Sequence, residues 1–472
     1  MSSIALAKPI QLGWTPAEIE RLTNGKWLDA PRADAWMAMG ICAEPTQFTE
    51  NQMLLARSGA AGLQPAVLSR LAGRSRGIIA EKGNEYLALG VPVLEVPDLR
   101  DAVTRLAVEA RRAFNGAVIA VTGSVGKTTT VAMAAHALAG IGISDRSRTS
   151  ANSPYGIGWN LASMRRDADY WVQEMAIGRM DVCSRLVQPD VAIVTAIAPA
   201  HLASFGSTDK IAALKARIYE GMKPGGIAVI NRDIPEYSIF EAAAHKAGLR
   251  TVSFGSGGDC DARFISFDGK TVHATIGGEE HRFALGAAGN HMAMNAIAVL
   301  AAVTALGGNI TLAADRFASF QPLAGRGKRS ASTYEGKRIE VWDDSFNANP
   351  ASMRAALRTM QNAPMVLPAS RVLILGDMLE LGPDEQTMHL GLRADILAAG
   401  ADRILFCGPL MEAVADLILR EVKGRWFPDV RAVEQGLKPW IHDGDTVLLK
   451  ASHGIHLDRL VRLLSRGAEA EA

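Results

Sequence analysis

Residues 118–130, VIAVTGSVGKTTT, constrain the fold more than any other part of this chain. An apolar run ends at Gly123 and Gly126 and leads into an alanine-rich segment, which predicts a buried strand, a glycine turn and the start of a helix. Glycines let backbone N–H groups converge there, and the helix N-terminus adds positive potential. The segment therefore predicts an α/β fold with a phosphate-binding loop.

The side chains in this loop suit a nucleotide. Lys127 can reach the outer phosphates, and Thr128 can place its hydroxyl on Mg²⁺. The usual spacing, G-x-x-x-x-G-K-[ST], would put a glycine at 121, where this chain has Val121. A glycine-rich turn into a core helix is the alternative, but the flanking strand and helix favour ATP binding. The candidate nucleotide-binding residues of the loop are Gly123, Ser124, Val125, Gly126, Lys127, Thr128 and Thr129.

Length and composition fit a multidomain enzyme. The chain has 472 residues, whereas one core rarely grows beyond ~250–300 residues. A formal net charge of +1 gives no basic surface for nucleic acid. The four cysteines are far apart, so neither a disulfide framework nor a zinc site is expected. No signal peptide and no membrane span of ~20 apolar residues is found, so we expect a cytoplasmic protein.

The order of strand-like and helical patterns divides the chain into three blocks. Residues 1–113 form a small mixed region. Residues 114–322 alternate short apolar runs with helices, which is typical of a mostly parallel sheet. Residues 323–472 repeat this alternation after a break rich in proline and glycine, and so predict a further α/β domain with its own sheet. Helices are expected at residues 15–23, 98–114 and 208–221, and strands at residues 77–80 and 93–96.

Polar side chains follow several of the expected strands, at the sheet edge where α/β proteins bind ligands. Glu174 lies in an otherwise apolar strand and is a plausible metal ligand near a Mg·ATP loop, although a lone buried glutamate is often only ion-paired. His201 follows the next strand, where a histidine is more often structural. Lys215 would by default be a solvated surface lysine. The strand IEVWDD ends in two aspartates, which suit a ribose, a cation or an amine, or belong to a loop that caps the next helix.

These segments together resemble the Mur ligases, and most closely the type that adds D-Ala-D-Ala to UDP-MurNAc-tripeptide. TGSVGKTTT is similar to the family's TGTNGKTT loop, and AHLASFGS followed by ALKA is similar to its AHLEGFGS…AK segment. GNHMAMNA resembles the element G-x-H-N-x-x-N-A. DDSFNANP and GDMLELG followed by His389 resemble the motifs of this subtype. The five matches occur in the family's order.

The resemblance implies a three-domain α/β fold. Residues 1–113 would form a small acceptor-substrate domain, residues 114–322 a central mononucleotide-binding domain with a mostly parallel sheet, and residues 323–472 a Rossmann-like domain. It also implies an ATP-dependent ligase. A substrate carboxylate attacks the γ-phosphate of ATP, and an amine then displaces phosphate to form an amide. The implied partners are therefore a small carboxylate acceptor and an amine, amino acid or dipeptide.

The resemblance assigns roles to matched positions. The implied catalytic residues are Lys127, Lys215, His201 and Glu174. Thr128 and Glu174 would hold one Mg²⁺ and His201 a second. Lys215 matches a carbamylated lysine, whose CO₂ adduct is a carboxylate-like metal ligand. ATP would sit between two domains that close over it. Further residues implied to surround the nucleotide are Asn295, Arg326, Asp344, Asn347 and Asn349.

The chain departs from the family's pattern near the substrates. Where the family has D-[ST]-R, which helps to hold the UDP group, this chain has Glu44-Pro45-Thr46. A bidentate phosphate contact is thereby lost, unless another basic residue such as Arg57 replaces it. The family's Asn-Asn pair is Asn152-Ser153 here, and its K-G-S-R is Lys450-Ala451-Ser452-His453. Both the family's default substrates and a repurposed ligase for a non-UDP acid and another amine fit this pattern.

Two other function classes are weaker. A phosphate-loop kinase or ATPase motor would use the loop but would leave DDSFNANP and GDMLELG unexplained. A catalytically silent scaffold would not need Glu174, His201 and Lys215 together. Phosphate release that depends on both a carboxylate and an amine separates the ligase from these two classes.

Overall fold

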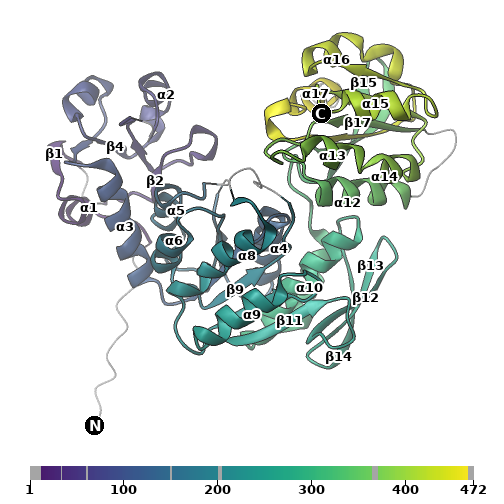
Figure 1. Cartoon of the computed structure of the whole chain (residues 1–472). Coiled ribbons are helices and arrows are strands. Elements are labelled where there is room, and N and C mark those ends of the chain that lie inside the picture. Colours follow the sequence, from purple (N-terminus) through teal and green to yellow (C-terminus); the bar gives the residue numbers. More distant parts are fainter. Residues whose placement is uncertain are drawn as a thin grey trace.

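Three β-sheets with helices packed on them make up the molecule (Figure 1). The structure is a computed structural model, and the central and C-terminal sheets share no strand among the described residues. The predicted fold class is therefore confirmed, whereas the domain boundaries near residues 113 and 322 stay a prediction. No helix in the described part of the chain is long and apolar enough to cross a membrane. The structure describes residues 12–32, 35–59, 62–148, 151–199, 205–363 and 370–465.

The N-terminal sheet has five strands in the order β1-β5-β4-β3-β2. The strands β2 to β5 pair in parallel, and β1 pairs with β5 antiparallel. Helix α1 (Pro16–Thr23) begins at a capping box of Thr15 and Glu18, and α3 (Leu99–Ala113) begins where Asp98 caps it, close to the predicted bounds. The strands are β1 (Lys26–Asp29), β2 (Ile41–Cys42), β3 (Met53–Leu55), β4 (Gly77–Ala80) and β5 (Val93–Glu95).

The central sheet has nine strands in the order β14-β13-β12-β11-β10-β9-β6-β8-β7. The strands β6 to β12 pair in parallel, as predicted, and β12, β13 and β14 extend the sheet as antiparallel strands. The strands are β6 (Ala117–Thr122), β7 (Ser144–Arg146), β8 (Tyr170–Glu174), β9 (Val191–Val194), β10 (Ile227–Asn231), β11 (Arg250–Gly255), β12 (Ala262–Phe267), β13 (Thr271–Ile276) and β14 (Glu279–Ala284).

Four helices of the central part bear on the site. Helix α4 (Lys127–Leu138) follows β6, and α5 (Pro154–Leu161) follows β7. Helix α8 (Thr208–Ala216) runs into a short 3-10 helix, Arg217–Gly221, so the helical segment predicted for residues 208–221 is confirmed. The alanine-rich α10 (Asn290–Ala305) lies against α4 and is buried over most of its length.

The C-terminal sheet has six strands in the order β15-β16-β20-β17-β18-β19. The strands β15 and β16 form an antiparallel hairpin. Each pair of neighbours in the row β16-β20-β17-β18-β19 is parallel. Helix α12 (Pro350–Gln361) follows β16. The strands are β15 (Lys328–Tyr334), β16 (Lys337–Asp344), β17 (Arg371–Gly376), β18 (Arg403–Cys407), β19 (Gly424–Phe427) and β20 (Thr446–Lys450).

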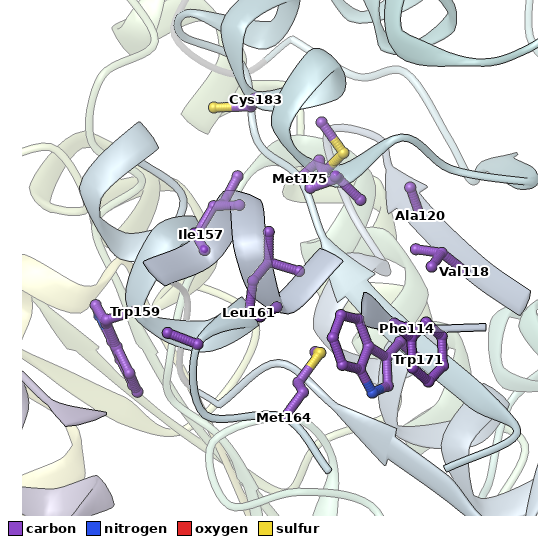
Figure 2. Close-up of a cluster of buried hydrophobic side chains, with 14 of the residues drawn as sticks. Phe114, Val118, Ala120, Ile157, Trp159, Leu161, Met164, Trp171, Met175 and Cys183 are labelled. Atoms are coloured by element: carbon purple, nitrogen blue, oxygen red, sulfur yellow. The ribbon is translucent and has the colours of Figure 1, made fainter. Parts of the chain in front are cut away.

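The N-terminal and central parts share one hydrophobic core. The ring of Phe114, which follows α3, stacks on Trp171 of β8 with the ring centroids 3.8 Å apart (Figure 2). The backbone N–H of Ile41 donates to Ser163 Oγ at 3.0 Å, and that hydroxyl donates to Ile41 O at 2.7 Å. These contacts join the N-terminal part to the central part of the chain.

Candidate active site

The phosphate-binding loop between β6 and α4 needs its glycines for steric reasons. Gly123 has φ +152°, and a Cβ there would lie 2.0 Å from Thr195 Oγ1, so no other residue fits. Gly126 has φ +84°, and a Cβ there would lie 3.1 Å from Asn295 Oδ1. Thr195 Oγ1 also donates to Val125 O at 2.6 Å. The loop is therefore held against the end of β9 and the start of α10, in the strand–turn–helix arrangement that the sequence predicts.

Two lysines converge on one carbonyl of this loop. Lys127 Nζ donates to Gly123 O at 2.9 Å, and Lys215 Nζ donates to the same oxygen at 2.8 Å. Lys215 is only 2% exposed, unlike the solvated lysine that its place on α8 suggests by default. Burial lowers the pKa of Lys215 well below its usual range, the nearby Lys127 lowers it further, and Glu174 opposes both effects. A lowered pKa increases the share of Lys215 that is a neutral amine, which is the form that reacts with CO₂.

Replacing Lys215 with methionine is expected to flatten the pH dependence of stability. Because the folded state lowers the pKa of Lys215, the unfolded chain binds this proton over the range between the folded and unfolded pKa values. The free energy of unfolding then rises with pH there, by up to about 1.4 kcal/mol per pH unit. Denaturant titrations of wild type and Lys215→Met, in CO₂-free buffer between about pH 7 and 9, measure the difference. Equal slopes would contradict a lowered pKa, and the exposed Lys210→Met is the control.

Glu174, at the end of β8, is the buried carboxylate next to the loop. Its Oε2 accepts a hydrogen bond from Thr128 Oγ1 at 2.5 Å, and its Oε1 accepts one from Asn152 Nδ2 at 3.1 Å. Ser124 Oγ and Asn152 Oδ1 are buried without a hydrogen-bond partner among the described residues. A hydroxyl, a carboxylate and two unpaired polar atoms fit a magnesium ion with a phosphate, because Mg²⁺ keeps water and phosphate ligands and needs few protein oxygens.

The described residues include the ligands predicted for the first Mg²⁺ site but not the histidine predicted for the second. Thr128 and Glu174 lie together as the first Mg²⁺ site requires. His201, predicted to hold a second ion, lies outside the described residues. No group of three histidine, cysteine, aspartate or glutamate side chains in the described ranges is placed to hold a metal. Any ion here would therefore depend on ligands from the nucleotide as well as from the protein.

The C-terminal sheet presents one carboxylate of its strand-end pair to the same space. Asp344 of β16 forms an ion pair with Lys450 of β20 at 2.7 Å, and Lys450 Nζ also donates to Asn347 O at 3.0 Å. Burial raises the pKa of Asp344, and Lys450 opposes this rise. Asp343 instead accepts a hydrogen bond from the backbone N–H of Gly325 at 2.6 Å. Asp343 thus supports the loop, and the Asp344–Lys450 pair lines the cavity described below.

Lys450→Met is expected to lower the free energy of unfolding by about 2 kcal/mol, because it leaves a largely buried carboxylate without its partner. The loss stays below that of a fully buried pair, since the Asp344 side chain is 24% exposed. Lys438→Met is the matched control, because Lys438 pairs with Glu335 at the same 2.7 Å but is 68% exposed, and it should cost less than about 1 kcal/mol. Denaturant unfolding measures both, and equal losses would contradict this account.

A cavity of about 520 Å³ joins the central and C-terminal parts. All predicted nucleotide-binding residues except Gly123 line it, and Gly123 lies in a small adjoining cavity with Lys127 and Lys215. The sequence prediction did not include Asn231 and His291, which also line the cavity. Their positions could have indicated it, because Asn231 is the last residue of β10 and His291 lies in the first turn of α10. The predicted residues that line the cavity are Ser124, Val125, Gly126, Lys127, Thr128, Thr129, Glu174, Asn295, Arg326, Asp344, Asn347 and Asn349.

Two motifs mainly support the backbone. Asn349 Oδ1 accepts a hydrogen bond from Ser352 N at 2.9 Å and caps α12, so the capping interpretation of this loop holds for Asn349 although it lines the cavity. In GDMLELG, the N–H of Met378 donates to His389 Nε2 at 2.9 Å, and the Asp377 carboxylate accepts backbone N–H groups. These hydrogen bonds give both motifs a structural role.

A second cavity of about 810 Å³ adjoins the first, with Thr128, Glu174, Arg326 and Phe346 lining both. The Arg326 guanidinium lies over the Phe346 ring, 4.0 Å from its centroid. The other walls come from residues 44–49 of the N-terminal part and residues 145–148 at the end of β7. A substrate in this second cavity can therefore reach Thr128 and Glu174, where the two cavities meet, while a nucleotide occupies the first cavity.

Comparison with known proteins agrees with this arrangement. Residues 121–303 match the Mur ligase middle domain, and residues 328–453 match the Mur ligase, glutamate ligase domain. UDP-N-acetylmuramoyl-tripeptide–D-alanyl-D-alanine ligase of Bacillus subtilis is 30% identical over 377 residues, covering 78% of this chain and 80% of that protein. The enzyme of that name from Rickettsia prowazekii is 29% identical over 369 residues, covering 76% and 81%.

Solved structures show the same fold. A crystal structure of MurF from Acinetobacter baumannii superposes with a TM-score of 0.77 at 24% identity, covering 97% of this chain and all of that one. MurF from Thermotoga maritima in complex with ADP gives a TM-score of 0.69 at 22% identity, covering 93% of this chain and all of the other. With the family's two domain models and its relatives matching along most of the sequence, the chain belongs to the Mur ligase family of ATP-dependent ligases.

Proposed function

We propose that this chain adds D-Ala-D-Ala to UDP-MurNAc-tripeptide, with ATP as the phosphate donor. The observation that carries the proposal is the pair of adjoining cavities, one built on the phosphate-binding loop and one on the N-terminal sheet, which meet at Thr128 and Glu174. The relatives from B. subtilis and R. prowazekii bear the name of this activity. Because the reaction consumes ATP, the proposed place of action is the cytoplasm.

The residues of the site divide the work. ATP would bind in the smaller cavity, where Lys127 leaves its contact with Gly123 O to hold the outer phosphates and neutralise their charge. Thr128 and Glu174 would hold Mg²⁺, which supplies charge neutralisation between the triphosphate and the incoming carboxylate. The carboxylate oxygen attacks the γ-phosphorus and ADP leaves. The amine then attacks the carbonyl carbon, and phosphate leaves with that oxygen.

Lys215 would serve as a carbamate. Without the adduct it lies beside Lys127, at the same carbonyl, where two ammonium charges would repel. The neutral amine adds to the carbon of CO₂ and loses a proton to solvent, which leaves an anionic carbamate that pairs with Lys127 and offers oxygen to a cation. The low pKa and the burial of Lys215 support this proposal. A second metal site with His201 remains part of the proposal.

A specific observation favours an alternative pair of substrates. Residues 44–49, all but Pro45 of which line the larger cavity, include no arginine or lysine, so the family's arginine after D-[ST] has no replacement within this segment. Arg57, the substitute that the sequence suggested, is engaged with Gly59 O at 2.7 Å and lines neither cavity. The alternative function is therefore a ligase of the same mechanism that joins a different, non-UDP acid to another amine.

An omission assay tests the proposed function. Phosphate release is measured with ATP, UDP-MurNAc-tripeptide and D-Ala-D-Ala together and with each left out in turn. We expect release only with all three present, and calorimetry should detect micromolar binding of the UDP compound. No binding at millimolar UDP-MurNAc-tripeptide would overturn the default and leave the alternative, for which a panel of carboxylic acids and amines replaces the two substrates.

A further inference from the structure

Two arginines at the end of β7, Arg146 and Arg148, line the larger cavity, and their guanidinium groups have few partners among the described residues. The Arg146 guanidinium makes no hydrogen bond or ion pair with any residue that the structure describes. The Arg148 Nη1 donates to Thr49 Oγ1 at 3.5 Å, the limit for a hydrogen bond, and no described carboxylate pairs with it. Both side chains are partly buried. Nearly all donors of the two guanidinium groups thus have no partner among the described residues.

Two of the three carboxylates that line the same cavity are engaged, and the third, Glu44, accepts only from Thr46 Oγ1 at 3.4 Å. Asp145 accepts hydrogen bonds from the backbone N–H groups of Arg146 and Arg165, each at 2.8 Å. Glu174 accepts its two bonds from Thr128 and Asn152. Burial lowers the pKa of Arg146, against the opposing effect of Asp145, which shows that the cation has lost part of its hydration. An arginine stays charged under these conditions and gains most from an anionic ligand.

From this placement we propose that Arg146 and Arg148 bind a second anionic group of the carboxylic-acid substrate, away from the carboxylate that reacts. The inference rests on the proposed function, because it assigns the larger cavity to the acid. The reacting carboxylate must lie beside Thr128 and Glu174, where the two cavities meet, so that it can reach the nucleotide. A cavity of about 810 Å³ has room for a far longer molecule, and a planar guanidinium pair matches a phosphate or carboxylate group.

A binding experiment with inorganic pyrophosphate tests the two arginines directly. The phosphate-binding loop is first saturated with Mg²⁺ and AMP-PNP, whose own binding is measured, and pyrophosphate is then titrated by calorimetry. We expect wild type to bind, and the double variant Arg146→Gln, Arg148→Gln to bind at least about tenfold more weakly. The double variant Arg146→Lys, Arg148→Lys, which keeps both charges and is the milder change, should fall in between. Arg57→Gln is the control and should bind as wild type does.

The outcomes separate this inference from the proposed function. Absence of pyrophosphate binding to wild type, or equal binding by all variants, overturns the role of the arginines, whatever the substrate is. Where UDP-MurNAc-tripeptide is turned over, the glutamine variant should raise its KM about tenfold with kcat and the KM for ATP nearly unchanged. If wild type does not turn over UDP-MurNAc-tripeptide, the default substrate is wrong. The role of the arginines is then decided by the pyrophosphate titration alone. Titration with malonate in place of pyrophosphate shows whether the group is a carboxylate or a phosphate.

Discussion

Lys127→Ala is expected to lower ATP turnover by at least ~1000-fold, because positioning and charge neutralisation carry most of the catalysis of phosphoryl transfer. Lys127 Nζ donates to Gly123 O, so its ammonium is kept within the phosphate-binding loop. Coupled measurement of ADP release, with both substrates present, gives the rate. The KM for ATP should change less than kcat does.

The control for this change is Lys210→Ala, an exposed lysine of α8 outside both cavities, which should keep the wild-type rate. Lys127→Ala also removes a buried contact, so thermal unfolding of the variant is measured alongside. A folded Lys127→Ala protein with turnover within about tenfold of wild type would contradict the role of the loop.

Lys215→Ala is expected to reduce turnover as strongly as Lys127→Ala. The substitution removes the side chain that would carry the carbamate and leaves a gap beside Lys127 and the loop. High concentrations of a short carboxylic acid such as acetate should restore part of the activity, because a free carboxylate can occupy this gap. Wild type assayed in CO₂-free buffer should lose activity and regain it on addition of bicarbonate.

The rescue separates chemistry from packing. Lys215→Met fills the gap with an apolar chain of similar length, so it should stay folded but inactive and should not respond to acetate. Wild-type activity in Lys215→Ala at low bicarbonate would contradict the carbamate and leave a structural lysine.

The sequence predicts well what a short segment determines. The glycine loop, the helices α1 and α3 and the polar ends of β8 and β16 follow from local patterns, and the structure has them close to where they were predicted. The parallel order of the sheets follows from the alternation of strands and helices. The strand hairpin β13–β14 was not predicted, because in β14 only Phe283 is buried and its burial pattern shows no alternation, although β13 alternates between buried and half-buried residues.

Contacts across long stretches of sequence are what the sequence cannot show. Lys450 meets Asp344 from 106 residues away, because β20 inserts between β16 and β17. The burial of Lys215 depends on α8 packing against the loop, and nothing in the sequence of this nine-residue helix tells Lys215 from the exposed Lys210. Arg146 and Arg148 have no motif and acquire meaning only where β7 reaches the cavity edge.

The transfer of oxygen from the acid to phosphate tests the central claim most directly. The acid that supports phosphate release is labelled with ¹⁸O in its reacting carboxylate and incubated with ATP and the amine in ordinary water. Since the carboxylate attacks the γ-phosphorus and its oxygen leaves with phosphate, mass spectrometry should find one ¹⁸O atom in each phosphate released. Phosphate without the label would show that water attacks ATP, and would contradict a ligase that activates its acid by phosphorylation.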